Sequence, residues 1–226
     1  MASHDEFKDQ KYLKTIQDMS EIYLDIAEKA EKFIKKIYKD KEINLPIDLN
    51  LIAEDLGIRI MQENLNINGG KSLSRILGRL ECENFQTWIK VEASVSYKTQ
   101  RYAIAHSIAR YLLREDKSWD ESSYAIPLIP QSLEEIMGDV LALFLLLPME
   151  TFKKEFSKYL EARKEYPMDV DLWLQYLSDK SQISLFNLSI GYQQLKQVLC
   201  LQRQKEFVAN GYDINKMEST YEKIFA

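Results

Sequence analysis

Gln100-Arg-Tyr-Ala-Ile-Ala-His-Ser-Ile-Ala-Arg-Tyr-Leu-Leu113 is a stretch whose residue pattern predicts a buried helix. Apolar residues occur on nearly every side of it, so little polar surface remains. The main exceptions are His106 and Arg110, which lie four residues apart. At that spacing both side chains leave the same face of a helix. The helix therefore presents an imidazole and a guanidinium together to whatever packs against it.

The same five positions match part of the His-Glu-x-x-His pattern of zinc peptidases. That pattern places two imidazoles on the metal and uses the glutamate to activate water. Here it reads His106-Ser107-Ile-Ala-Arg110. The first ligand is kept, whereas a serine replaces the general base and an arginine replaces the second ligand.

Three segments in this order resemble successive signatures of the ImmA/IrrE family. They are Leu45–Ile58, Gln100–His106, and Glu135–Asp139 continuing into Leu145-Leu-Leu-Pro148. The family comprises small zinc-peptidase-like regulators, often encoded by mobile elements, that act on repressor proteins. The resemblance covers roughly residues 30–195 and implies a zincin-like fold.

The resemblance also implies which residues to compare with the family's metal ligands, two histidines of one helix and a glutamate of the next. Only His106 and Glu135 occupy matching positions in this chain. Asp139 matches a position that supports the ligands without binding the metal.

Composition favours a soluble, cytoplasmic protein over a membrane protein or a general nucleic-acid-binding protein. The net charge of the 226 residues is −5, so non-specific binding to nucleic acid is not expected. Cys82 and Cys200 follow no pairing pattern, which is typical of a reducing compartment. The polar N-terminus does not resemble a signal peptide, and the longest apolar run, Val140–Pro148, is too short to cross a bilayer.

The periodicity predicts an α+β fold: a mostly helical, zincin-like domain with a small, mostly antiparallel sheet, followed by a helical C-terminal region. We place the boundaries at 1–25 for an N-terminal helical extension, 26–165 for the peptidase-like domain and 166–226 for the C-terminal helices. Apolar residues from Tyr12 to Ile37 follow a heptad spacing. That helix either lies on its own domain or, in its first part, pairs chains into a homodimer or docks a partner.

Local signals place the remaining elements of the central domain. Asp48 is expected to cap a short helix that ends at Gly57. Strands are expected at Ile58–Met61, Ile76–Glu81 and Thr87–Val91, and a second motif helix from Ser132 to Leu147, with Ser132 and Glu135 at capping-box spacing. Gly69-Gly-Lys-Ser72 has Leu65 where a phosphate loop needs glycine, so no nucleotide site is expected.

The pattern of apolar residues from Val170 to Phe207 predicts two or three helices, including a helix-turn-helix-like pair around Ile183–Leu188. Such pairs serve packing as often as DNA reading. The second helix of the pair carries few basic residues, so DNA binding is not expected.

The donor set is too small for a catalytic zinc site. Zinc in a peptidase needs three protein ligands and an open position for water, whereas His106 and Glu135 supply two. Arginine stays protonated and cannot ligate, and the other candidates are His4, Cys82 and Asp139. Ser107 lacks the basicity to activate water. We therefore expect no catalytic residue, no metal and no cofactor, with zinc bound through His106 and Glu135 only if the enzyme interpretation holds.

A metal-free arrangement explains the substitutions together. A buried Glu135 without a counter-charge is costly, and the Arg110 guanidinium can supply that charge in a forked pair with Glu135, joined by Asp139. Simpler interpretations remain open. Glu135 is then only a capping residue, His106 a hydrogen-bonded core histidine, and Arg110 a side chain that reaches solvent.

Three functions follow from these patterns. The first is a regulator without catalytic activity that binds a protein partner such as a mobile-element repressor. The second is a zinc-dependent endopeptidase with altered ligands that cleaves a repressor. The third is a DNA-associated transcriptional regulator acting through its C-terminal helices.

Overall fold

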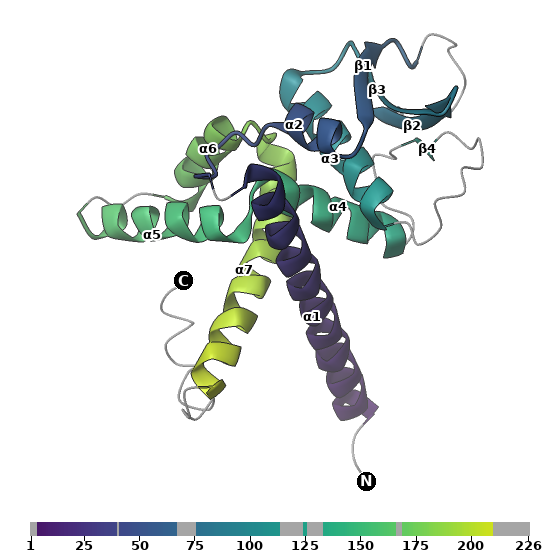
Figure 1. Ribbon diagram of the computed structural model, residues 1–226. Helices are drawn as coiled ribbons and strands as arrows, with labels where there is room; N and C mark the ends of the chain where they lie inside the picture. The colour runs from purple at the N-terminus through teal and green to yellow at the C-terminus, as the bar shows by residue number, and fades with distance from the viewer. Residues whose placement is uncertain are drawn as a thin grey trace. The chain divides into compact units, whose positions relative to one another are not determined.

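The computed structural model describes residues 4–39, 41–66, 76–113, 124–125, 133–165 and 169–209. Over these residues the chain is α+β and mostly helical, as expected from the sequence, with seven helices and a small sheet (Figure 1). The chain divides into two compact units. One contains residues 26–191, and the other contains residues 1–25 together with residues 192–226.

The sheet has four strands in the order β1-β3-β2-β4: β1 Ile58–Glu63, β2 Gly78–Glu83, β3 Gln86–Glu92 and β4 Tyr124–Ala125. β3 pairs with β1 in parallel and with β2 antiparallel, and β2 also pairs antiparallel with β4. The sheet is therefore mixed and mostly antiparallel, as expected. The loop expected between β2 and β3 is shorter than its composition indicates, because Glu83 already pairs with Gln86.

Strand alternation separates the two faces of this sheet. Ile58, Leu80 and Ile89 are buried on one face, as the period of two requires. The other face carries charged residues, and its central cation is Lys90, which lies 2.6 Å from both Glu81 and Glu83. α3 (Tyr97–Leu113) packs against β2 and β3 and also against α4 (Leu133–Leu146).

Local sequence signals explain where α2 begins and how the chain turns from α2 into β1. Asp48 caps α2 (Leu49–Asp55), because its Oδ1 accepts hydrogen bonds from the main-chain nitrogens of Asn50 at 2.9 Å and Leu51 at 3.3 Å. Gly57 follows with φ +68°, a left-handed conformation that suits glycine after a helix. The cap and the glycine that sequence reasoning assigned are both confirmed. The capping-box serine, Ser132, lies outside the described residues.

The remaining helices are α1 (His4–Tyr38), α5 (Met149–Glu165), α6 (Val170–Ser181) and α7 (Leu185–Ala209). Aromatic rings join α5 to α6: Trp173 packs on Phe152, Phe156 and Tyr159 with ring centroids 4.9–5.9 Å apart. α6 is also tied to α3, since Lys98 Nζ lies 2.7 Å from Asp179 Oδ1. Among the described residues, no helix combines the length and the apolar character needed to cross a membrane.

Candidate functional site

The four ionisable residues singled out in the sequence lie together where α3 packs against α4. His106 and Arg110 come from α3, and Glu135 and Asp139 come from α4. Each pair is separated by four residues, so one face of each helix presents both of its side chains. Ser107 is also buried on α3, but a direct neighbour of His106 leaves the helix on a different side.

Arg110 and Glu135 form an ion pair inside this interface. Arg110 Nη1 lies 3.8 Å from Glu135 Oε1, and the side chains are 8% and 17% exposed. The interpretation that Arg110 reaches solvent is therefore wrong. A guanidinium cannot lose its proton here, so it places a permanent positive charge beside the carboxylate.

Asp139 has different partners from those expected. The Tyr102 hydroxyl donates a hydrogen bond of 2.8 Å to Asp139 Oδ1, and His106 Nε2 lies 3.4 Å from the same oxygen. Asp139 therefore contacts Tyr102 and His106 and not the Arg110 pair that was expected. Burial raises the pKa of the Asp139 carboxyl, and the hydrogen bond from Tyr102 offsets part of this rise. Burial and the charge of Asp139 raise the pKa of Tyr102 well above its ordinary value.

His106 is held neutral at physiological pH. It is 1% exposed, and burial, reinforced by the charge of Arg110, lowers its pKa to about 4. The imidazole donates a hydrogen bond to the main-chain carbonyl of Glu135, which opposes part of this shift. Nδ1 is buried and has no hydrogen-bond partner among the described residues. The interpretation of His106 as a hydrogen-bonded core histidine is thus supported.

Gly138 has no side chain, which allows α4 to pack closely against His106 and Arg110 of α3. A Cβ atom at that position would lie 3.2 Å from His106 Nε2 and 3.4 Å from Arg110 Cγ. Sequence reasoning missed both Gly138 and Tyr102. Tyr102 was detectable, because it precedes His106 by four residues and so shares its face, whereas the role of Gly138 depends on how the two helices meet.

These residues do not fit the zinc that the family resemblance implies. His106 Nε2 faces the main chain of α4 at Gly138, and Arg110 places a fixed cation next to Glu135. Cys82 lies on β2, opposite Thr87 of β3. Across the described parts of the chain, no three His, Cys, Asp or Glu side chains are placed to hold a metal ion. The chemistry of this donor set favours an internal ion pair.

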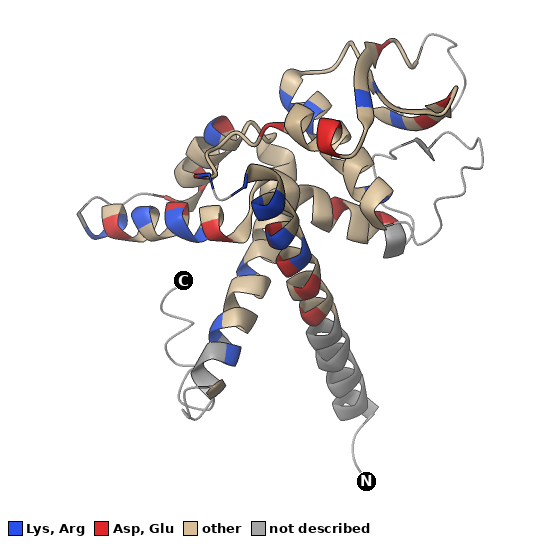
Figure 2. Cartoon of the chain, in the orientation of Figure 1, with Lys and Arg blue, Asp and Glu red and all other residues tan. Residues whose placement is uncertain are grey.

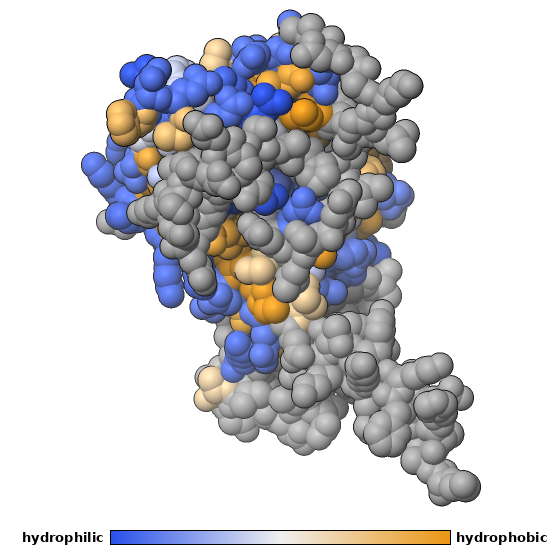
Figure 3. Space-filling view, turned by 90° about the vertical axis from the view of Figure 1, so that its right-hand side faces the viewer, coloured by the Kyte–Doolittle hydropathy of each residue, from blue (hydrophilic) through white to orange (hydrophobic). Residues whose placement is uncertain are grey.

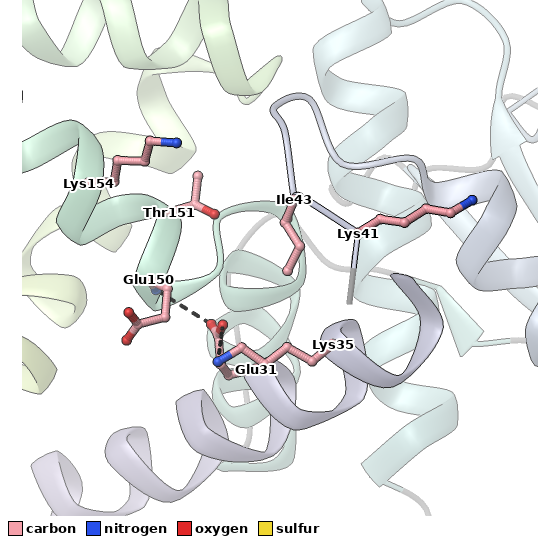
Figure 4. Close-up of a pocket in the computed structure, with 7 residues that line it drawn as sticks. All are labelled: Glu31, Lys35, Lys41, Ile43, Glu150, Thr151 and Lys154. Atoms are coloured by element: carbon pink, nitrogen blue, oxygen red, sulfur yellow. Dashed lines mark hydrogen bonds and ion pairs between the residues drawn. The ribbon is translucent and has the colours of Figure 1, made fainter. Parts of the chain in front are cut away.

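A separate surface pocket lies beside the first turn of α5 (Figure 4). Charged side chains dominate its lining: Glu31, Lys35, Lys41, Glu150 and Lys154, with Ile43 and Thr151. Its charges are largely paired, since Lys35 lies 3.3 Å from Glu31 and Lys154 lies 3.0 Å from Glu42.

No model of a known protein family matches the sequence, and no curated protein matches it.

Proposed function

We propose that this protein is a regulator without peptidase activity that uses a zinc-peptidase-like helix pair to bind a protein partner, such as the repressor of a mobile element. The kind of partner comes from the sequence resemblance to the ImmA/IrrE family. The lack of peptidase activity rests on one observation, the Arg110–Glu135 ion pair between α3 and α4 at 3.8 Å.

The ion pair matters because it meets the electrostatic need that a metal would otherwise meet. A carboxylate in a mostly buried position needs a nearby positive charge, and Arg110 supplies one within the protein. Burial lowers the pKa of His106, and repulsion from the Arg110 charge lowers it further. The same repulsion disfavours a metal cation beside the imidazole. Hydrolysis lacks a general base as well, because Ser107 replaces the glutamate that activates water in zinc peptidases.

The exposed surface of α7 supports a protein partner over DNA. Three described residues in its first turns, Leu185, Phe186 and Ile190, are large, apolar and exposed. No charged residue occurs between Leu185 and Leu195, and Figure 2 shows these turns without Lys or Arg. A helix that reads DNA needs cations for phosphates and polar side chains for base edges.

The test is incubation of the purified full chain with the repressor proteins encoded next to its gene, with and without added zinc. Size-exclusion chromatography scores complex formation, and intact-mass spectrometry scores cleavage. The expected result is a stable complex with an uncleaved repressor under both conditions. Zinc-dependent cleavage, or the absence of any complex, would overturn the proposal.

Arg110→His is the matched variant, because it places a second imidazole on the His106 face of α3. It removes the fixed cation and adds a metal ligand in one step. We expect this variant to bind zinc more tightly than the native chain does, as measured by calorimetry. Equal zinc binding by both proteins would show that Arg110 does not control metal access.

A further inference from the structure

The sheet has one edge with open hydrogen-bonding groups. β1 is the outermost strand at its end of the sheet, next to β3 (Figure 1). Ala93 N donates a hydrogen bond of 2.9 Å to the main-chain oxygen of Glu63, so Glu63 directs its main-chain groups toward β3. Alternate residues of a strand direct these groups to opposite sides. Ile60 and Gln62 therefore direct their N–H and C=O groups away from the sheet.

Other described residues leave these outward groups unpaired and accessible. Within the described parts of the chain, no hydrogen bond reaches the main chain of Ile60 or Gln62 from another segment. Four of the six β1 residues are exposed, including the last three in a row. The other end of the sheet differs, because β4 pairs there with β2. An open strand edge is a template on which another strand can pair.

β1 carries little of the protection that open edges usually have. Proteins block such edges with proline, lysine, a bulge or a charge on the inward face. β1 contains neither proline nor lysine, and its residues pair with β3 in an unbroken register, so no bulge bends it. Its inward side chains, Ile58, Ile60 and Gln62, are uncharged. The charged residues of β1 are Arg59 and Glu63, and their positions decide which strand fits.

Arg59, Met61 and Glu63 alternate along the outer face of β1 in a pattern that is complementary to itself. If two copies of β1 run antiparallel with Met61 opposite its own counterpart, Arg59 of each copy lies opposite Glu63 of the other. Directly opposed residues of opposite charge stabilise a strand pair, whereas like charges destabilise it. The same register pairs Ile60 with Gln62 of the second copy. Each of these pairs can exchange both main-chain hydrogen bonds, because their groups point outward.

Both charged side chains are available for this pairing. The Arg59 guanidinium carbon lies 5.5 Å from the centre of the Trp88 ring, and among the described residues Arg59 has no ion pair. Glu63 Oε2 lies 3.8 Å from Lys90 Nζ, whereas two other carboxylates hold the same nitrogen at 2.6 Å. Glu63 is therefore the most weakly held of the three carboxylates, and its side chain is 45% exposed.

We propose that β1 is a dimerisation edge, through which two copies of this chain join their sheets antiparallel about a two-fold axis at Met61. This contact is separate from the partner binding proposed above and does not rest on it. Contact of one patch with itself is the commonest way in which proteins form dimers. Figure 3 shows hydrophobic areas interspersed with hydrophilic ones on the face it displays. Pairing through main-chain hydrogen bonds does not need a broad apolar patch.

A second copy fits this edge better than an unrelated strand does. Any extended peptide can satisfy the main-chain groups. Pairing with both charges, however, needs a strand whose acidic and basic residues lie four positions apart in the matching order, and β1 is itself such a strand. A register centred on Ile60 would place Arg59 opposite Met61 and Glu63 opposite Gly57, with no direct charge pair. The charges therefore favour the register centred on Met61.

Charge reversal tests the pairing in the full chain. Arg59→Glu and Glu63→Arg each place like charges opposite one another on both sides of the axis. In sedimentation equilibrium we expect the native chain to dimerise and each variant to have a dimer dissociation constant about tenfold higher. The matched control is Arg163→Glu, an exposed residue in the last turn of α5 with the same change in charge. That control should dimerise as the native chain does.

Two combinations restore the opposite charges. The double variant Arg59→Glu/Glu63→Arg exchanges the two residues, so each again faces its opposite in the second copy. An equimolar mixture of the two single variants pairs a strand carrying two acidic residues with one carrying two basic residues. We expect both the double variant and the mixture to associate with the affinity of the native chain. Circular dichroism of every variant checks that it is folded.

Met61→Cys tests the register, in a chain that also carries Cys82→Ser and Cys200→Ser. The register centred on Met61 brings the two thiols directly opposite each other at a non-hydrogen-bonded pair, within reach of a disulfide. Oxidised glutathione should therefore yield a disulfide-linked dimer. Adding Arg59→Glu to the same chain should suppress that product at the same protein concentration.

The contrary results are equally specific. A native chain that stays monomeric up to its solubility limit would overturn the dimerisation edge. So would a dimer that both charge reversals leave unchanged, because it would form through another surface such as the N-terminal helix. Failure of the double variant and the mixture to associate, or no disulfide at position 61, would overturn the antiparallel register. None of these results bears on repressor binding, which is tested separately.

Discussion

Replacing Arg110 with methionine removes the buried positive charge while keeping a side chain of similar length. Arg110 Nη1 and Glu135 Oε1 are 3.8 Å apart, and at an effective dielectric constant of about 20 two unit charges at that distance attract by about 4 kcal/mol. Desolvation of both groups offsets part of this attraction. We therefore expect a net coupling of about 2 kcal/mol, and a loss of about 3 kcal/mol for Arg110→Met alone, because Glu135 is left without its cation.

A double-mutant cycle measures this coupling directly. Urea unfolding at pH 7.5, followed by circular dichroism, gives the free energy of unfolding for the native chain, Arg110→Met, Glu135→Gln and the double variant. The double variant should be more stable than Arg110→Met, because no uncompensated carboxylate remains. A coupling below about 0.5 kcal/mol would refute the reasoning, because the pair would then act like an exposed surface ion pair.

Three further predictions concern stability. The pKa of His106 is lowered to about 4 in the folded protein, so the imidazole of the unfolded chain is protonated first as the pH falls. The free energy of unfolding should therefore fall as the pH drops from about 6.5 to 4. His106→Gln should remove about 2 kcal/mol of that fall between pH 7.5 and 4.5. The carboxylate of Glu92 accepts a 2.6 Å hydrogen bond from the Ser94 hydroxyl, which lowers its pKa to about 2. The stability that this carboxylate contributes should be present above about pH 4.5 and lost as the pH falls toward 2, and Glu92→Gln should lack this pH dependence. Gly191→Ala would place a Cβ atom 2.6 Å from Leu143 Cδ2 and should cost about 1–2 kcal/mol, less when combined with Leu143→Ala.

A specific result would contradict each of these three stability predictions. A His106→Gln variant with the native pH profile would mean that the imidazole titrates normally. A Glu92→Gln variant that unfolds in acid like the native chain would assign acid unfolding to other carboxylates. Additive losses for Gly191→Ala and Leu143→Ala would show that the two positions do not interact.

The sequence predicts which side chains each of the two helices presents together, because that depends on local spacing. His106 and Arg110, like Glu135 and Asp139, are four residues apart, and helical geometry alone places each pair on one face. The cap at Asp48 and the glycine at position 57 are equally local signals. Periodicity also predicts β1, β2 and β3 with each end within two residues, whereas it does not predict the two-residue β4.

What the sequence leaves out depends on contacts between distant segments. The partner of Asp139 is decided by how α4 is placed along α3, which brings Tyr102 rather than Arg110 within hydrogen-bond distance. The turn at Phe85 is missed for another reason. Its composition indicates a five-residue loop, and the two-residue turn appears only once strand pairing fixes Glu83 opposite Gln86.

The most direct test of the central claim is a calorimetric titration of zinc into the full chain at pH 7.5, after treatment with chelator, alongside His106→Ala. If Arg110 supplies the positive charge between α3 and α4, both proteins should show the same weak binding or none. Binding of one zinc per chain with a nanomolar dissociation constant, abolished by His106→Ala, would contradict the account.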